Sequence, residues 1–382
     1  MKKVAIIGAG ISGLFIANLF NRNPNYKATL YEKSSFTSLD EGYGIQLSVN
    51  SIKLLNEIEF FKLENEKKFN PDKINFYLNK NSNKICELLI SDFNSEHIKY
   101  TTLKRSTLTN FLKKDLKDII KTNHSISKID QRSQSIRLTF KNNEIFECDY
   151  LIISDGVFSK SKSLIANNQS QPKYNNTLAI RGMIPSSSKK IYDNKNISLF
   201  LDSDFHYVTY PVTPNGDLNF IAIMKYKLSK EEQKNYTLFS ENAFINKVLG
   251  KVEKKNIGFL DNLKELKIFP VFVSNNFYKS QNKNIHLIGD AFYAFSPSFA
   301  QGASQSIESA YELFKSIENN AESDFFKNRV KKIKMINIRS KFNQFSFHLS
   351  NPFFSFLRNI LLKQLVKNKK FLESYLGKIY KS

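Results

Sequence analysis

The chain has 382 residues, of which 41% are hydrophobic and 24% are charged. This balance supports a buried core and excludes a disordered chain, and the length fits about two to three domain-sized units. No uncharged apolar stretch reaches about 18 residues, so a membrane-spanning helix is not expected.

Basic residues outnumber acidic ones: 57 Lys and Arg against 35 Asp and Glu give a formal net charge of +22. The lysines are spread along the chain and accompany no nucleic-acid-binding motif, so no nucleic-acid partner is predicted. Attraction of anionic substrates, cofactors or lipid surfaces is a simpler use of this charge. Cys86 and Cys148 form no CxxC pattern and the five histidines no HExxH. Neither a disulfide scaffold nor a metal site is therefore expected.

The N-terminal segment predicts a strand, a helix and a second strand. Residues 3–8 are a short apolar run that ends at glycine, which is typical of a buried parallel strand. Residues 12–22 have apolar residues near helical spacing, Pro24 helps to end this helix, and residues 27–32 follow as a strand. A βαβ unit of about 30 residues has the size of a dinucleotide-binding half.

The loop between the first strand and the helix reads GxGxxG. Gly8 permits the tight turn, Gly10 leaves room for the backbone to approach a pyrophosphate, and Gly13 allows close helix packing. The helix N-terminus offers free N–H groups to the phosphates. Glu32 ends the second strand, where a carboxylate can accept hydrogen bonds from ribose hydroxyls. The sequence predicts a dinucleotide site, but this unit alone does not separate NAD from FAD.

The rest of the chain is predicted to form further strands and helices. Residues 73–90 read as a hairpin and residues 106–120 as an amphipathic helix. The other predicted elements are a helix at 49–60, short strands within 125–154, strands at 177–184, 197–201, 206–212, 218–225 and 285–289, a helix carrying Ile307 to Ile317, and a helical C-terminal segment.

Two later motifs narrow the choice of dinucleotide. Asp155-Gly156 follows a strand, and Gly289-Asp290 closes another strand before a loop that runs through Pro297 to Gln301. With GxGxxG, these motifs stand in the order and at about the spacing seen in class A FAD-dependent monooxygenases. Over roughly residues 1–345 the chain resembles this aromatic-ring hydroxylase superfamily of para-hydroxybenzoate and salicylate hydroxylases.

The resemblance implies an α/β fold in which a Rossmann-like, GxGxxG-type FAD-binding domain carries an inserted mixed β-sheet substrate domain and C-terminal helices. The FAD-binding domain is expected to be discontinuous. The implied boundaries are 1–70, 98–175 and 270–345 for the FAD-binding domain, 71–97 and 176–269 for the substrate domain, and 346–382 for the C-terminal helical segment.

The resemblance also implies a set of site residues. Asp290 can bond the ribityl hydroxyls of FAD, and the helix that begins at Gly302 can direct N–H groups at the flavin pyrimidine edge. The implied cofactor-binding residues are Gly8, Gly10, Ser12, Gly13, Glu32, Lys33, Gly44, Gln46, Arg105, Asp155, Gly156, Asp290, Gly302 and Ala303. The implied catalytic residues are Pro297, Gln301, Arg181 and Tyr210, and further candidate substrate contacts are His206, Tyr207 and Tyr293.

The activity implied by the resemblance is hydroxylation of an aromatic or other electron-rich small molecule through a flavin hydroperoxide, with bound FAD, NADH or NADPH, and O2. Substrates would be aromatic, polyketide-like or quinone-like, and the protein a cytoplasmic monomer or dimer. Two departures from the family pattern, Phe292-Tyr293 in place of Ala-His and Lys162 in place of Arg, leave open a second interpretation. In that interpretation the chain is an FAD-binding redox protein that does not hydroxylate.

The C-terminal segment allows a further alternative. Residues 352–381 hold seven Lys and Arg against one acid, interleaved with aromatic and aliphatic residues. Such a basic amphipathic pattern suits weak peripheral contact of residues 352–382 with an anionic membrane, as in a hydroxylase of a prenylated quinone precursor. The competing interpretation is a terminal helix pair that packs on the FAD-binding domain.

Overall fold

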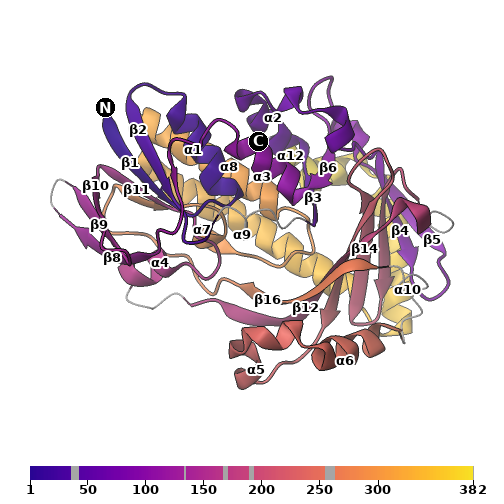
Figure 1. Cartoon of the computed structure of the whole chain (residues 1–382). Coiled ribbons are helices and arrows are strands. Elements are labelled where there is room, and N and C mark those ends of the chain that lie inside the picture. Colours follow the sequence, from indigo (N-terminus) through magenta and orange to yellow (C-terminus); the bar gives the residue numbers. More distant parts are fainter. Residues whose placement is uncertain (36–42, 133–134, 167–170, 189–192, 254–262, 382) are drawn as a thin grey trace.

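A computed structural model describes residues 1–35, 43–132, 135–166, 171–188, 193–253 and 263–381 (Figure 1). Its first layer is a five-stranded sheet in the order β17-β11-β1-β2-β7, in which every pair is parallel. This confirms the predicted βαβ start, with α1 between the first two strands. The bounds are β1 Lys2–Ile7, α1 Ile11–Asn21, β2 Tyr26–Tyr31, β7 Ile120–Lys121, β11 Tyr150–Ile153 and β17 Ile285–Leu287.

Both faces of the parallel sheet are covered, which explains the unbroken buried apolar runs Val4–Ile7 of β1 and Tyr150–Ile153 of β11. Val4 and Ile6 of β1 face a core built with α1, α3 and α8, whereas Ala5 and Ile7 face a small antiparallel sheet and α7. The bounds are α3 Arg105–Lys113, β8 Ile126–Gln131, β9 Ile136–Phe140, β10 Ile145–Cys148, α7 Gly289–Tyr293 and α8 Gly302–Glu318.

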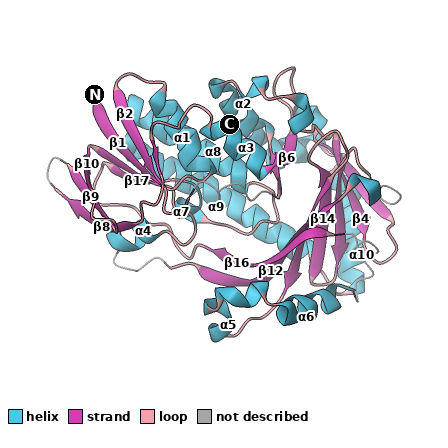
Figure 2. Cartoon of the chain, in the orientation of Figure 1, coloured by secondary structure: helices cyan, strands magenta, loops and turns pink. Residues whose placement is uncertain are grey.

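The second layer is a seven-stranded mixed sheet in the order β16-β12-β15-β14-β13-β4-β5, with the β13–β4 pair parallel (Figure 2). Helix α6 covers one face through Phe244 and Val248, which share a hydrophobic core with Phe205 and Phe220, and the short helix α5 precedes it. The bounds are β4 Lys73–Leu78, β5 Lys84–Leu89, β12 Lys173–Ile184, β13 Ile197–Asp202, β14 Phe205–Pro211, β15 Leu218–Lys225, α5 Lys230–Lys234, α6 Asn242–Glu253 and β16 Lys264–Val273.

The remaining elements link the two sheets. The long helix α9 runs between them, and the two-stranded pair β3–β6 lies where they meet (Figure 1). The C-terminal segment divides: α10 lies near β5, while Leu376, Ile379 and Tyr380 are buried. The bounds are β3 Gly44–Leu47, α2 Val49–Leu55, β6 Thr101–Lys104, α4 Lys160–Ile165, α9 Glu322–Phe347, α10 Pro352–Leu365, α11 Lys369–Leu372 and α12 Lys378–Tyr380.

Two predicted helices are shorter than the sequence suggested. The helix predicted at 106–120 ends at Lys113, because the chain must turn to bring Ile120 beside β2 as strand β7. Leu116 is still fully buried. The chain after Lys113 forms tight turns, which bring Leu116 to the same core as the helix. The helix predicted at 49–60 ends at Leu55 and continues as short 3₁₀ turns.

The buried His286 on β17 makes stability depend on pH. Burial lowers the pKa of His286 to about 4, although Glu322 opposes this shift. An unfolded histidine titrates near pH 6.5, so between these values the unfolded chain binds a proton that the folded chain does not. The contribution of His286 is therefore complete above about pH 6.5 and is lost as pH falls toward 4, at about 1.4 kcal/mol per pH unit.

The variant His286→Gln is expected to lose this contribution to the pH dependence of stability. Between pH 6.5 and 4.5 the slope of its free energy of unfolding against pH should be smaller than that of the parent by about 1.4 kcal/mol per pH unit. Urea unfolding at pH 6.5, 5.5 and 4.5 measures the slope. His97, which is largely exposed, provides the control in His97→Gln, for which the slope stays that of the parent. Equal slopes for the His286 variant and the parent would contradict the assignment.

Candidate active site

A cavity of about 790 Å³ lies between the parallel sheet and the mixed sheet. Twelve of the predicted site residues line it: Gly10, Ser12, Gly44, Gln46, Arg105, Gly156, Arg181, Tyr210, Asp290, Pro297, Gly302 and Ala303. The fold thus brings residues of the three separated motifs to one space.

The glycines of the first loop divide into two kinds. Gly8 has a φ of +103°, and a Cβ there would lie 2.7 Å from the Ser154 carbonyl oxygen. A Cβ on Gly13 would lie 2.0 Å from the Gly8 carbonyl oxygen. A Cβ on Gly10 would instead meet only the Ser154 carbonyl oxygen, at 4.0 Å, and would point at otherwise open space. Gly8 and Gly13 therefore serve packing within the protein, whereas Gly10 leaves room that no protein atom fills.

Charged groups and a helix end face this part of the cavity without protein partners. Among the described residues, neither the Arg105 guanidinium nor the Asp290 carboxylate has a hydrogen bond or an ion pair. The enclosing protein raises the pKa of Asp290, and Arg105 opposes this shift. Helix α8 begins at Gly302 without a side-chain cap, and a Cβ on Gly302 would meet nothing within 4 Å. A cation, an anion and free N–H groups thus surround a space that fits FAD.

Glu32 and Lys33 lie outside the cavity lining. The Glu32 carboxylate is buried and accepts hydrogen bonds from the backbone N–H of Ala9 (2.8 Å) and Ser34 (3.0 Å). These bonds hold the glycine loop against the end of β2. Because each carboxylate oxygen has a second lone pair, acceptance from a ribose hydroxyl stays a prediction. Lys33 is exposed at the surface.

The Asp155 side chain belongs to the protein framework. It accepts hydrogen bonds from the Ser161 N–H (3.0 Å) and the Ser159 hydroxyl at the start of α4, and it does not line the cavity. Only Gly156, with a φ of +83°, faces the cavity from this motif. Lys162 is buried, donates to the Ala291 carbonyl at 3.3 Å, and has its pKa lowered by burial. The residue that departs from the family pattern thus joins α4 to α7 within the protein.

At the other end of the cavity, polar groups stand on the mixed sheet. The Tyr100 hydroxyl donates to Gln46 Oε1 at 2.8 Å, and the Gln46 and Asn219 side chains oppose the effect of burial on the pKa of Tyr210. The Arg181 guanidinium lies 5.7 Å from the centre of the Tyr43 ring and has no hydrogen bond or ion pair among the described residues. Burial lowers the pKa of Arg181, and it raises that of Tyr210 against the effect of Arg181.

Strand alternation on β14 separates the predicted contacts. His206 and Tyr210 face the cavity, whereas Tyr207 stacks on Phe200 at 4.5 Å in the core that α6 covers. His206 Nδ1 also lies 2.7 Å from Nε2 of His348, and burial lowers the pKa of His206 well below its usual value. The period-two rule could have excluded Tyr207 from the sequence, but no local signal pointed to His348.

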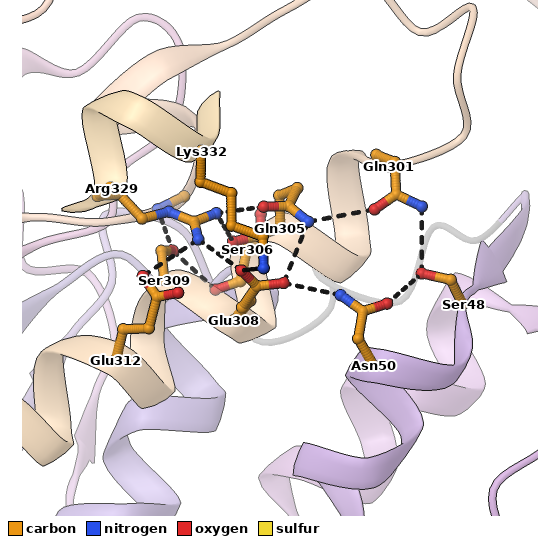
Figure 3. A network of polar contacts seen from close by, with 11 residues as sticks. Ser48, Asn50, Gln301, Gln305, Ser306, Glu308, Ser309, Glu312, Arg329 and Lys332 are labelled. Atoms are coloured by element: carbon orange, nitrogen blue, oxygen red, sulfur yellow. Dashed lines mark hydrogen bonds and ion pairs between the residues drawn. The ribbon is translucent and has the colours of Figure 1, made fainter. Parts of the chain in front are cut away.

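Gln301 and Tyr293 are placed away from the cavity as well. The Gln301 amide donates to the Ser48 hydroxyl at 3.1 Å, and its oxygen accepts from Gln305 at 3.2 Å (Figure 3). Tyr293 stacks on Phe277 at 4.4 Å and does not line the cavity. Gln301 is therefore not placed to touch substrate in this structure, and Pro297 is the residue of that loop which lines the cavity.

The glycine loop, shaped for a dinucleotide, and the mixed sheet, with its polar side chains, open into one cavity. This combination defines a flavin-dependent oxidoreductase. Residues 1–322 match the family model described as FAD binding domain, and the chain belongs to this family. It is a class A FAD-dependent monooxygenase with NADH or NADPH as the family's typical co-substrate.

Named relatives and solved structures agree with this assignment. The 6-hydroxynicotinate 3-monooxygenase of Bordetella bronchiseptica is 23% identical over 96% of this chain and 98% of its own. Salicylate hydroxylase of Pseudomonas putida is 22% identical over 81% of this chain and 75% of its own. The same fold occurs in Klebsiella pneumoniae HpxO complexed with FAD and uric acid, with a TM-score of 0.80 and 13% identity over 98% and 97% of the two chains.

Proposed function

We propose that this monooxygenase hydroxylates a small electron-rich aromatic molecule whose negatively charged oxygen lies at Arg181. The observation that carries the proposal is the unpartnered Arg181 guanidinium, which lies in the same cavity as Arg105, Asp290 and the α8 N-terminus. The named relatives act, by their names, on 6-hydroxynicotinate and salicylate, which are small aromatic acids. Polyketide-like and quinone-like molecules with a phenolic oxygen share this chemistry.

We assign roles on the same basis. Gly10 and the α1 N-terminus would hold the pyrophosphate of FAD, and Asp290 would accept hydrogen bonds from ribityl hydroxyls. Bound FAD supplies the redox chemistry with NAD(P)H and O2. Arg181 would fix the substrate oxygen, and Tyr210, which lines the cavity with Gln46, would donate or accept a hydrogen bond there. Pro297 would shape the wall between the two parts of the cavity.

The test is turnover on a panel of phenols and aromatic acids, measured by NAD(P)H oxidation and by product mass. A product heavier by one oxygen atom supports hydroxylation. Cofactor binding without substrate-stimulated oxidation across the panel would favour the second interpretation, an FAD-binding redox protein. We further propose that the protein acts in the cytoplasm. We also propose that it is a monomer or dimer, and sedimentation of the FAD-bound protein tests this oligomeric state.

Arg181→Met is expected to raise the KM for an anionic aromatic substrate by about 10- to 100-fold, the effect of losing a hydrogen bond to a charged group of about 1.5–3 kcal/mol. FAD retention should be unchanged. Lys264→Met provides the control, because Lys264 is an exposed cation at the start of the neighbouring strand β16. If both variants have the KM of the parent, the substrate oxygen does not lie at Arg181.

A further inference from the structure

The last two long helices expose an unusual amount of apolar surface. Nine large hydrophobic side chains on α9 and α10 are each 43–67% exposed; we call them the apolar face. They are Ile338, Phe342, Phe345, Phe353, Phe354, Phe356, Leu357, Ile360 and Leu361. The two helices lie together, because the buried Arg358 of α10 donates to the Ser346 carbonyl of α9 at 2.9 Å. A soluble monomer rarely exposes so many large apolar side chains on two neighbouring helices unless something covers them.

The charge around the apolar face has a single sign. Between Asp324 and Glu373 the chain contains no acidic residue and twelve Lys and Arg. Five exposed lysines accompany the face: Lys341, Lys363, Lys367, Lys369 and Lys370. A second copy of the chain would bring the same positive charge against it, whereas an anionic lipid surface is complementary. Among the described residues, no helix has the length and apolarity to cross a bilayer.

We propose that the apolar face docks on an anionic lipid bilayer, with α9 and α10 lying in the plane of the interface. The aromatic and aliphatic side chains would enter the boundary between headgroups and acyl chains, and the lysines would contact anionic headgroups. In this proposal the two interpretations apply to different parts of the C-terminal segment: the buried Leu376, Ile379 and Tyr380 pack on the protein, and the exposed apolar side chains of α10 would face the membrane.

The same helices form one wall of the cavity. Phe342 is 56% exposed and also lines the cavity, and Leu362, Leu365 and Val366 line it from α10. The helix pair therefore borders both the proposed bilayer and the site, and Phe342 belongs to both borders. We infer, on the basis of the proposed function, that the substrate is amphipathic: an aromatic head for Arg181 and an apolar tail that reaches this wall from the lipid.

Vesicle co-sedimentation of the FAD-bound protein tests the docking. The protein is expected to bind vesicles of phosphatidylcholine mixed with phosphatidylserine, to bind pure phosphatidylcholine more weakly, and to bind less at high salt. The triple variant Phe345→Ser, Phe353→Ser, Phe356→Ser is expected to lose about tenfold or more of this affinity while retaining FAD. Phe61→Ser is the control, because Phe61 is 53% exposed outside the apolar face.

Three results would overturn the docking proposal. The first is no binding of the parent to anionic vesicles, and the second is equal binding by parent and triple variant. The third is a parent dimer that becomes monomeric in the triple variant, because the apolar face would then be an interface between copies. None of these measurements depends on turnover, so loss of hydroxylation without loss of vesicle binding would count against the proposed function alone.

The substrate class is tested by activity on vesicles. A phenol with a long alkyl chain, embedded in anionic vesicles, is expected to be hydroxylated by the parent and at least about tenfold more slowly by the triple variant. A short water-soluble phenol is expected to be turned over equally by both. If the parent hydroxylates soluble phenols and leaves the alkyl phenol unchanged, the amphipathic-substrate inference is wrong and the proposed function stands.

Discussion

Gly10→Val is expected to give a folded, colourless protein that has lost FAD affinity by at least about a hundredfold, or about 2.7 kcal/mol. The backbone at Gly10 has φ −75° and ψ −179°, which any residue adopts. An added Cβ meets only the Ser154 carbonyl oxygen, at 4.0 Å, so the protein itself can accommodate the side chain. The valine would instead fill the space at the α1 N-terminus where we place the pyrophosphate.

Absorbance of bound flavin in the purified protein, FAD titration and a urea unfolding midpoint check this result. Gly250→Ala is the control, since a Cβ on Gly250 meets nothing within 4 Å and Gly250 lies in α6, away from the cavity. Gly13→Ala should behave differently and reduce stability, because its Cβ would lie 2.0 Å from the Gly8 carbonyl oxygen. A yellow Gly10→Val protein would refute the cradle.

The parts of the site that depend on short stretches of chain could be predicted from the sequence. The glycine loop joins a strand and a helix that are adjacent in the chain, so residues 8–13 have a defined place once those elements form. Gly302 is fixed in a similar way as the first residue of α8, and Asp290 as the second residue of α7, which follows β17 closely in the chain. The family resemblance then supplied the identity of the dinucleotide, which the local patterns left open.

Side-chain direction could not be predicted where distant partners decide it. Gln301 turns away from the cavity because Ser48 and Gln305 bind its amide, and Gln305 in turn is held by Arg329 of α9. The Asp155 carboxylate accepts a hydrogen bond from the Ser161 N–H at the start of α4 and so does not face the cavity. The sequence could not predict whether the apolar side chains of α10 are exposed, because a basic amphipathic helix can pack on protein or lie on lipid.

Glu308 lies at the centre of the polar network that holds Gln301, and Glu308→Leu is expected to destabilise the protein by about 3–5 kcal/mol. The carboxylate is 4% exposed, accepts from Arg329 at 2.9 Å and from Asn50 at 2.7 Å, and pairs with Lys332 (Figure 3). Burial alone would raise the pKa of Glu308, but Arg329 and Lys332 hold it below its usual value.

The large cost follows from what the substitution leaves behind. Arg329 is 1% exposed, and of its two carboxylate partners it would keep only Glu312, at 3.2 Å, which itself is one-third exposed. Its hydrogen bonds to the Gln305 oxygens would remain, but they supply no counter-charge. Leaving a buried cation short of its counter-charge costs far more than losing an ion pair at the surface. Glu64→Gln gives that comparison, because the Glu64–Lys67 pair is 62% and 52% exposed and should contribute about 1 kcal/mol or less.

Urea unfolding of the two variants measures the difference, and FAD titration shows whether it reaches the site. The network continues from Glu308 through Gln305 to Gln301 at the start of α8, and through Asn50 to Ser48, which accepts from Gln301 and closes the ring (Figure 3). Loss of the carboxylate should therefore weaken FAD binding as well as stability, whereas the surface variant changes neither. If Glu308→Leu costs no more than Glu64→Gln, Arg329 is solvated or paired elsewhere, and the network does not position the α8 N-terminus.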